Sequence, residues 1–405
     1  MANTIKINDL ILKESAVAFE NGSTLLAGST KNYDSSYAMN GAKSGTDIRF
    51  KVPQRFEVTS GKTANIQNYE EQEVTLQRST RQHVAFSLDT EELSVDKDGT
   101  LMGMGVEDIR AAGYALASKC ERDGHSELAK NAFLFGGTAG SNANTWLTYG
   151  TAQAKLVKYG AIRDNNGEVI LTPDSSAAIM AVLNAYQNPV DETSRQFVFG
   201  YIKKVAGFSF SESPDVYRHT NGTAAGTILV KGASQTGSTL IIDGMTSGQT
   251  ITAGTKGKLS TVKSVNRVSG ESTGEAFEFT VTESTTVNVS GEATITISPP
   301  ITTSGAYKTI TASPPNDEPV TFQGAASLEY AQSLCFKRNA VAFGTIDLKV
   351  PGINALVESR NVYNNLSMRL IKDYEFVNDD CRYRLDIEYG WKAIVPEFIQ
   401  VIGQA

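Results

Sequence analysis

Residues 382–397 read RYRLDIEYGWKAIVPE and contain a clear secondary-structure signal. Its first half alternates tyrosine, leucine and isoleucine with charged residues, which is the pattern of a strand buried on one face and solvated on the other. We therefore predict a strand over Cys381–Tyr389. Further upstream, Ser367–Tyr374 (SMRLIKDY) predicts a second strand and Leu328–Leu334 predicts a short helix. The C-terminal part thus has a mixed α/β pattern.

Residues 224–323 differ in composition from both flanks. The segment is rich in Thr, Ser and Gly and contains no Cys, His or Trp. Short β-prone runs alternate with turn signals, as in a small sandwich or barrel. Because helical and mixed α/β patterns surround it, we interpret it as an all-β domain inserted into another domain. Its β runs are Thr227–Lys231, Thr239–Asp243, Ala276–Val281 and Ala293–Ile297.

The sequence before this segment predicts helices. Val106–Phe135 keeps its apolar residues close to one stripe at a spacing of three to four, and Gly136–Gly137 is expected to end the helix. A second helix is predicted from Asp174 to Asn188. Residues 1–44 predict a mobile arm that carries one short amphipathic helix, from Ile5 to Phe19.

Residues 46–88 alternate apolar and polar positions in several short runs around a polar tip at 60–65. A long hairpin that reaches neighbouring subunits is one interpretation, and ordinary strands in a compact sheet are the other. The pattern alone favours neither. The predicted strands are Ile48–Val52, Arg55–Val58, Glu73–Gln77 and His83–Leu88.

Composition excludes several classes of protein. The chain has 405 residues, 40% hydrophobic and 20% charged, so wholesale disorder is not expected. A net charge of −7 argues against a basic nucleic-acid reader but not against a container facing DNA. We see neither a secretory signal nor a membrane helix. The odd number of cysteines, Cys120, Cys335 and Cys381, fits buried thiols in a bacterial cytoplasm.

No group of residues in the sequence predicts a catalytic, metal-binding or cofactor-binding site. The nearest candidate is Asp123, His125 and Glu127, but residues two apart on a helix do not share a face, so a solvated helix face is the favoured interpretation. His83 and His219 have no partner at ligand spacing. The glycine-rich stretches near 136 and 254 are best interpreted as turns. We therefore predict no catalytic, metal-binding or cofactor-binding residues, and no enzyme.

Several stretches, in the same order, resemble the coat proteins of short-tailed phages of the Salmonella podovirus type. The first is Ile202–Thr223, which contains VAGF and then SP. The ending, R-x-D-x-x-Y-G followed by P-E in 382–397, is the most specific, and together the matches span residues 195–405. The other matching stretches are Val230–Leu240, Ile295–Ile301, Ser304–Pro314 and Cys335–Phe343.

The resemblance implies an α+β fold of the Hong Kong 97 capsid type with an inserted β barrel or sandwich. Its closing strands are expected to return to the peripheral sheet. The implied divisions are an N-arm at 1–44, an extended E-loop at 45–90, a peripheral domain at 91–149 and 376–405 with a spine helix at 104–135, an axial domain at 150–223 and 325–375, and the inserted domain at 224–324.

The implied function is that of a major capsid protein whose copies form pentamers and hexamers of an icosahedral shell, first a procapsid and then a mature head, around double-stranded DNA. Implied partners are a scaffolding protein, a portal protein and non-specifically held DNA, with no membrane. The chain would assemble in the bacterial cytoplasm and reside in the virion.

Two sets of contacts are hypotheses of this resemblance. E-loop ion pairs between subunits would involve one set of charged residues, and this interface is favoured over the alternative that these charges only keep the hairpin soluble: Arg49, Lys51, Arg55, Glu57, Lys62, Glu70 and Glu71. Scaffolding contacts in the N-arm would involve Lys6, Asp9, Lys13 and Glu14.

One departure from the family concerns the link Gly232–Ser238, which is short where the best-known member has a long acidic loop. A twofold ion-pair role for that loop is therefore in doubt. The rival functions are a nanocompartment shell of the same fold, a tail or adhesion protein, and, least favoured, a hydrolase.

Overall fold

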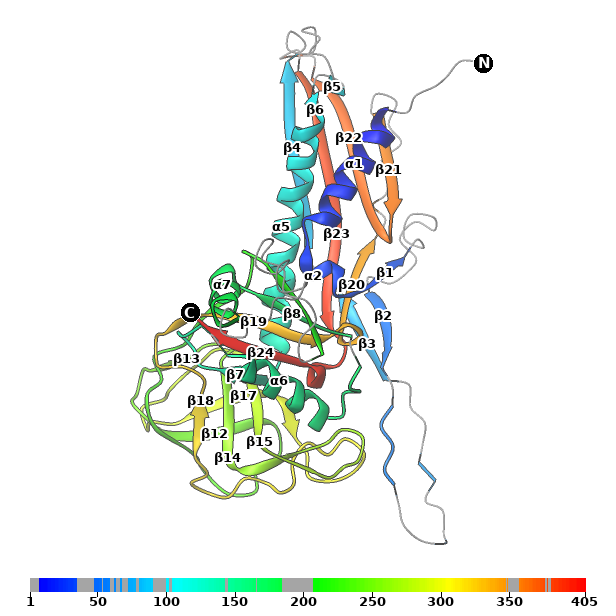
Figure 1. The fold of residues 1–405 in the computed structure, drawn as a ribbon. Helices are drawn as coiled ribbons and strands as arrows, with labels where there is room; N and C mark the ends of the chain where they lie inside the picture. Colours follow the sequence, from blue (N-terminus) through cyan, green and yellow to red (C-terminus); the bar gives the residue numbers. More distant parts are fainter. Residues whose placement is uncertain are drawn as a thin grey trace. The chain divides into compact units, whose positions relative to one another are not determined.

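The fold is seen in a computed structural model (Figure 1), and its chain divides into two compact units. Unit 1 comprises Met1–Phe50, Glu73–Gly124 and Ala342–Lys392, and unit 2 comprises Lys51–Gln72, His125–Val341 and Ala393–Ala405. The structure describes residues 7–34, 47–52, 54–58, 62, 66–67, 72–77, 80–89, 100–101, 104–142, 145–164, 166–183, 207–346, 348, 357–375, 377 and 380–405.

Unit 1 is built on a six-stranded sheet in the order β1-β20-β23-β22-β21, with β4 also paired to β23. In β23 the odd-numbered Tyr383, Leu385 and Ile387 are buried, as the alternation of the sequence predicts, but the even-numbered Asp386 and Glu388 are buried as well, so the expected solvated face is not present there. The strands are β1 (Thr30–Asp34), β4 (Thr80–Asp89), β20 (Val341–Ile346), β21 (Val357–Tyr363), β22 (Leu366–Glu375) and β23 (Asp380–Ala393).

Helices α1 (Ile7–Asn21), α2 (Thr24–Ala27) and the first part of α5 (Val106–Asn131) belong to the same unit. Gly113 lets α5 approach α1, because a Cβ there would lie 2.7 Å from the carbonyl oxygen of Ser15. The α1 side chains of Leu12, Ala16 and Phe19 are fully buried. The predicted N-terminal helix is thus present from Ile7 onward, but it is packed in unit 1 and is not a mobile arm.

Unit 2 contains a second six-stranded sheet, in the order β7-β24-β19-β8-β9 with β10 paired to β19. Tyr149 and Leu156 of α6 pack with Val169, Phe208 and other buried residues of this sheet. The elements are β7 (Leu134–Gly137), β8 (Gly167–Leu171), β9 (Phe208–Glu212), β10 (Arg218–Thr220), β19 (Glu329–Lys337), β24 (Ile399–Gln404), α6 (Trp146–Lys158), α7 (Pro173–Leu183) and the 3-10 turns η2 (Arg338–Ala340) and η3 (Pro396–Phe398).

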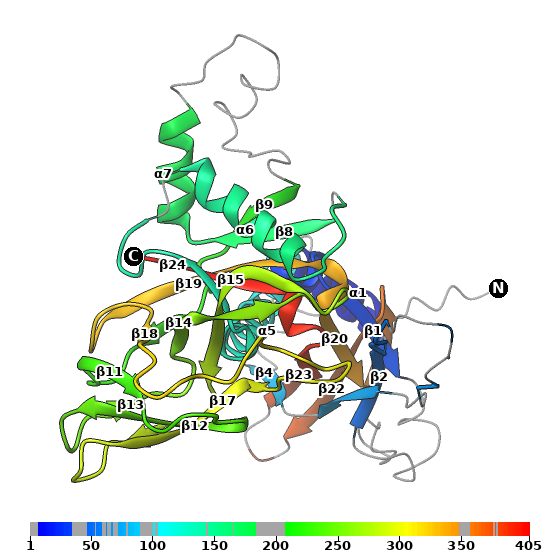
Figure 2. The same cartoon turned by 90° about the horizontal axis from the view of Figure 1, so that it is seen from below.

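The inserted segment forms a closed barrel in unit 2 (Figure 2). Its strands run in the order β11-β12-β17-β15-β14-β18. The barrel closes because the N–H of Val230 donates to the carbonyl of Glu318 (2.9 Å) and that of Asp317 to the carbonyl of Val230 (2.9 Å). The strands are β11 (Gly226–Val230), β12 (Gly237–Met245), β14 (Lys256–Val265), β15 (Ser272–Val281), β17 (Ala293–Ile301) and β18 (Val320–Phe322), with a separate pair β13 (Thr250–Ile251) and β16 (Thr285–Thr286).

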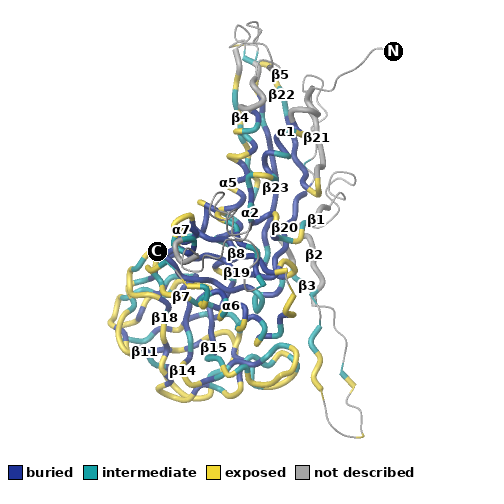
Figure 3. The backbone as a smooth tube through the Cα atoms, viewed as in Figure 1, coloured by how far each residue is buried: buried dark blue, intermediate teal, exposed yellow. Residues whose placement is uncertain are grey.

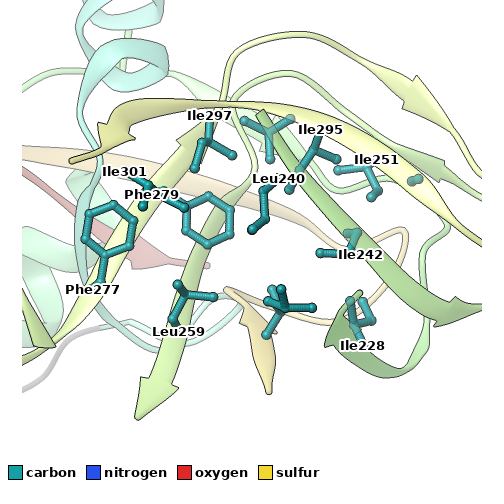
Figure 4. Close-up of a cluster of buried hydrophobic side chains, with 14 of the residues drawn as sticks. Ile228, Leu240, Ile242, Ile251, Leu259, Phe277, Phe279, Ile295, Ile297 and Ile301 are labelled. Carbon is teal, nitrogen blue, oxygen red and sulfur yellow. The ribbon is translucent and has the colours of Figure 1, made fainter. Parts of the chain in front are cut away.

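Alternate side chains of the barrel strands point into one apolar core, which Figure 4 shows between β12, β14, β15 and β17. Leu240, Ile242, Leu259, Phe279 and Ile295 are fully buried. Figure 3 shows the same contrast along the chain, with buried strand interiors and exposed connecting turns. The predicted all-β barrel or sandwich is therefore a barrel.

The spine helix is shorter than predicted. It ends at Asn131, and the glycines expected to end it lie in β7, which pairs in parallel with β24 from Leu134 to Gly137. The Asn131 amide donates to the backbone carbonyl of Glu127 (2.8 Å). Apolar residues just after the helix thus enter a strand, a preference that a helical stripe in the sequence does not reveal.

The helix predicted at Leu328–Leu334 is wrong, because Glu329–Lys337 is strand β19. From Tyr330 onward it is buried on both faces, so its sequence lacks the alternation of apolar and polar residues that marks a half-solvated strand. Helix α6 was not predicted. Of the helix predicted from Asp174, Pro173–Leu183 is described.

The strands of the region expected to form a long hairpin do not all pair with one another. β2 (Asp47–Val52) pairs with β3 (Gln72–Gln77), but β4 pairs with β23 in the sheet of unit 1, as in the compact-sheet alternative. The strand predicted at Arg55–Val58 is wrong, since these residues have no regular structure. A short pair, β5 (Thr100–Leu101) and β6 (Met104–Gly105), completes the described elements.

The closing strands do not return to one sheet. β22 and β23 pair from Met368–Ile387 to Glu375–Asp380 in unit 1, whereas β24 joins the sheet of unit 2. The domain boundary expected between residues 375 and 376 therefore falls between two paired strands. The other boundaries stay predictions.

Candidate assembly surfaces

The extended segment between β2 and β3 exposes large apolar side chains. Phe56 is 57% exposed, Val58 is 88% exposed and Ile66 is 90% exposed. Gln67 links the described parts of this segment, because its Oε1 accepts from the N–H of Glu57 (2.9 Å). Large exposed apolar side chains on one segment make it a candidate surface for association.

Arg55, which precedes Phe56, is engaged within unit 2. Its guanidinium forms an ion pair with Glu397, which also pairs with Arg267 (3.3 Å), and it lies 5.4 Å from the centre of the Tyr307 ring. The Arg55 side chain is only 14% exposed. In the single chain its charge is thus paired with Glu397, and its contact with a neighbouring subunit stays a prediction.

The other E-loop charges divide into three groups. Glu57 and Lys62 are exposed, so both are accessible to a neighbour. Arg49 and Lys51 lie in β2, but their side chains are outside the described structure. Glu70 and Glu71 lie outside the described residues altogether.

The four N-arm residues expected to contact a scaffolding protein differ in exposure, in ion pairing and in whether the structure describes them. Lys13 of α1 is exposed, whereas Glu14 forms an ion pair with Arg110 of α5 (3.2 Å) within unit 1. Asp9 lies in α1 with a side chain that is not described, and Lys6 is outside the described residues. Lys13 thus remains as the described candidate for such a contact.

The barrel is attached to the rest of unit 2 by buried polar contacts. Lys155 of α6 donates to Glu278 of β15 (2.7 Å) and to the carbonyl of Phe135 (2.7 Å). Glu278 also accepts from the N–H of Phe135 (3.1 Å). Burial raises the pKa of the Glu278 carboxyl, and the neighbouring Lys155 opposes that rise. The inserted domain is thereby fixed to α6 and β7 and is not a loosely tethered module.

In unit 1 a buried carboxylate lies among three arginines. Asp386 is fully buried and pairs with Arg369 (2.5 Å), Arg384 (2.7 Å) and Arg81 (3.1 Å). Burial alone would raise the pKa of Asp386, but the hydrogen bonds from the guanidiniums outweigh it and hold the pKa below its ordinary value. This cluster joins β4, β22 and β23 across the sheet.

The residues weighed as chemical candidates are not brought together. His125 is fully buried and so does not lie on the solvated helix face that was favoured. Asp123 bonds to Lys119 (2.7 Å) and the hydroxyl of Tyr389 (2.8 Å). Within the described part of the chain, no group of three or more His, Cys, Asp and Glu side chains is arranged to hold a metal ion.

His83 is exposed, and His219 lies in unit 2 with Nε2 3.3 Å from the hydroxyl of Thr255. Cys120 and Cys335 are buried free thiols, as predicted. Among the described helices, none combines the length and the apolar character that crossing a bilayer requires.

Sequence reasoning selected the charges of the extended segment and missed its apolar residues. The signal was present, because Phe56 and Val58 alternate with Arg55 and Glu57. That alternation was attributed to a half-buried strand, whose apolar face would be hidden. Only the absence of strand pairing at residues 54–58 reveals that the apolar side chains stay exposed in the single chain.

Comparison with known proteins gives a family. The sequence profile of the P22 coat protein family (P22 coat protein, gene protein 5) matches residues 1–403. No curated protein sequence matches the chain.

Solved structures similar to this chain include Mycobacterium phage Che8, with 10% identity, 95% of this chain and 90% of that chain covered, and a TM-score of 0.46. The mature capsid of bacteriophage PhiM1 has 9% identity, coverage of 95% and 87%, and a TM-score of 0.45. The virus-like particle from Pyrococcus furiosus has 8% identity, coverage of 98% and 100%, and a TM-score of 0.42. With its family profile matched from residue 1 to residue 403, this chain belongs to the P22 coat protein family and is a major capsid protein of the icosahedral phage shell.

Proposed function

We propose that copies of this coat protein associate through the segment between β2 and β3, of which residues 54–58, 62 and 66–67 are described, with apolar contacts supplying more of the affinity than ion pairs. The observation that carries the proposal is the exposure of Phe56, Val58 and Ile66 on a segment without strand pairing at 54–58. A monomer gains nothing from holding three such side chains in water. A neighbouring copy that covers them removes this apolar surface from solvent.

Magnitudes favour the apolar contacts. Burying a valine, isoleucine or phenylalanine side chain completely contributes about 1.5–3 kcal/mol. An exposed ion pair of Glu57 or Lys62 contributes roughly 0–1 kcal/mol. Contacts of this modest size let a misplaced subunit leave, while their sum over pentamers and hexamers holds a finished shell together.

The remaining roles extend the same proposal. The shell would enclose double-stranded DNA, held non-specifically, with a portal protein at one vertex and a scaffolding protein present during assembly. Lys13 of α1 is the described candidate for a scaffolding contact. No catalysis is part of this function. Copurified particles filled with DNA support it, whereas particles filled with protein would support a nanocompartment shell, and fibres or tubes would support a tail protein.

The triple substitution F56S/V58S/I66S is expected to reduce the yield of closed shells at least tenfold without changing the unfolding midpoint of the isolated chain. A loss of about 1.4 kcal/mol per contact already changes an association constant tenfold. The three side chains are largely exposed in the single chain, so its own stability does not depend on them. Electron microscopy and sedimentation after co-expression with the scaffolding protein measure the yield.

The matched control is V289S, because Val289 is 92% exposed on a turn of the barrel. It should assemble like the wild-type chain. A second arm, the charge exchange E57K/K62E, should weaken assembly less than the triple substitution. Shells at wild-type yield from F56S/V58S/I66S would refute the apolar contact. A larger loss of particle yield from the charge exchange would mean that ion pairs supply most of the affinity. Arg55 is not used here, since reversing its charge would also break its pair with Glu397.

A further inference from the structure

A lysine of the inserted barrel lies buried at the end of the spine helix. Lys256, the first residue of β14, is fully buried, and its ammonium donates to the backbone carbonyls of Ala129 and Ala132. It also donates to the hydroxyl of Thr280 (3.1 Å), the residue opposite it on β15. Thr280 in turn donates to the carbonyl of Lys130 (3.1 Å). All of these residues belong to unit 2.

The carbonyls of Ala129 and Lys130 are among those that a helix leaves without partners, and Ala132 directly follows the last helical residue. The last four C=O groups of an α-helix have no intrahelical donor, and the helix dipole places partial negative charge there. A cation is therefore favoured at this end, and Lys256 supplies one from a different domain. Of the described carboxylates, none forms an ion pair with this ammonium, so the helix end is its main electrostatic partner.

Other barrel side chains continue the pattern along the chain. Glu278 of β15 accepts from the N–H of Phe135 (3.1 Å), and Gln323, just after β18, donates to the carbonyl of Gly136 (3.0 Å). Side chains of the barrel thus bind the backbone throughout the passage from helix α5 to strand β7. Phe135 and Gly136, which receive these contacts, lie in β7 where it pairs with β24.

We propose that Lys256 couples the inserted barrel to the spine helix: its ammonium is the C-terminal cap of α5, so that the barrel sets where the helix ends and the two open together. Lys256 is a positioning residue, since it acts on the backbone of α5 and β7. The proposal does not depend on how the extended segment contacts a neighbouring subunit.

The charge state of Lys256 provides a readout of its burial at the helix end, because the cost of burying the ammonium outweighs the attraction of the helix carbonyls. Burial lowers its pKa to about 7. The titratable groups near this site are Lys130 on α5 and His219 on β10. Burial, and then the charges of Lys256 and Lys130, lower the pKa of His219 to about 4, so His219 is neutral at pH 7. Because the folded chain holds the Lys256 proton less tightly than the unfolded chain, stability rises as the pH increases from about 7 towards the ordinary lysine value of 10.5.

The test compares K256M with K258M in the full chain, since Lys258 is a half-buried residue two positions along the same strand. Methionine keeps the length and apolar stem of lysine but cannot donate. In K256M, hydrogen exchange in the peptide 128–137 is expected to be at least tenfold faster, including the Ala132 amide that bonds to the Leu128 carbonyl. K258M should exchange like the wild-type chain.

The second readout is the pH profile. The unfolding midpoint of the wild-type chain relative to that of K256M should move in favour of the wild type between pH 7 and pH 10, and no such movement should separate K258M from wild type. Unchanged exchange in 128–137 together with a flat difference profile would overturn the coupling.

If K256M does not fold, reductive methylation of the wild-type chain decides the question. Lys256 should be labelled at least tenfold more slowly than Lys258, and at the rate at which residues 128–137 open. Labelling of Lys256 while 128–137 stay protected from exchange would show that barrel and helix end open separately, and would overturn the proposal.

Discussion

Replacing Asp386 with asparagine is expected to lower the free energy of unfolding by about 3–5 kcal/mol, because breaking a buried charge cluster leaves a charge without compensation. Arg369, which is 7% exposed, would lose its carboxylate partner inside the sheet of unit 1. Arg81 and Arg384 are more exposed and can turn to solvent. Urea unfolding of the full chain measures the change.

Asp373 supplies the control, since it lies on neighbouring β22 and is exposed. D373N should change the free energy of unfolding by about 0.5 kcal/mol or less. If D386N and D373N had equal effects, the three guanidiniums would not need the carboxylate, and the cluster would have no stabilising role.

The same carboxylate gives a pH dependence whose sign is fixed by its lowered pKa. A carboxyl whose folded pKa lies below the ordinary value of 3.8 stabilises the fold fully above that value and loses its contribution as the pH falls through the folded pKa. The stability difference between wild type and D386N should therefore be constant near neutral pH and shrink below about pH 4. A difference that grew in acid would contradict the ion-pair explanation.

The substitution F279A is expected to cost about 3–5 kcal/mol, the range found when a buried phenylalanine is truncated and leaves a cavity. Phe279 is fully buried in the barrel core among Leu240, Leu259 and Ile295. Since Glu278 and Lys256 connect this barrel to α6 and to the end of α5, the loss should also reduce the amount of chain available for assembly. Calorimetry of the isolated chain and particle yield measure both effects.

V289A is the companion control for this substitution, because Val289 lies on the same barrel but 92% exposed, where truncation should change stability by about 0.5 kcal/mol or less. Equal melting temperatures for F279A and wild type would mean that the barrel core does not stabilise the chain.

Strands with apolar residues at alternate positions or in short β-prone runs could be predicted from the sequence. Alternation in Cys381–Tyr389 matches β23, and the β runs of the inserted segment match β11, β12, β15 and β17. Strand β19 could not be predicted. Residues Leu328–Leu334 mix apolar and polar positions without strict alternation, because the strand is buried on both faces, and such a mixture fits a short helix as well.

The location of the proposed assembly surface could be predicted from the sequence, but not which of its side chains are available for contacts. Charges of the segment 46–88 pointed to it, yet whether a charge is free depends on residues distant in sequence. Arg55 is held by Glu397, a partner that no local pattern reveals. The role of Lys256 could not be predicted either, because its ammonium binds the backbone carbonyls of Ala129 and Ala132, and backbone groups leave no signal in a sequence.

The barrel is, in topology, the connecting loop of a β-hairpin. β10 and β19 pair antiparallel from Arg218–Ala331 to Thr220–Glu329, and the chain leaves one for the barrel and returns to the other. Asn221 bridges the two crossing points, since its amide donates to the carbonyls of Gln323 (2.8 Å) and Ala325 (3.0 Å). A short turn could therefore replace the whole domain without altering the hairpin's register, which makes such a graft easy to gain during evolution. Deleting the barrel would be harder than gaining it, because its side chains now provide the hydrogen-bond partners of backbone groups between residues 129 and 136.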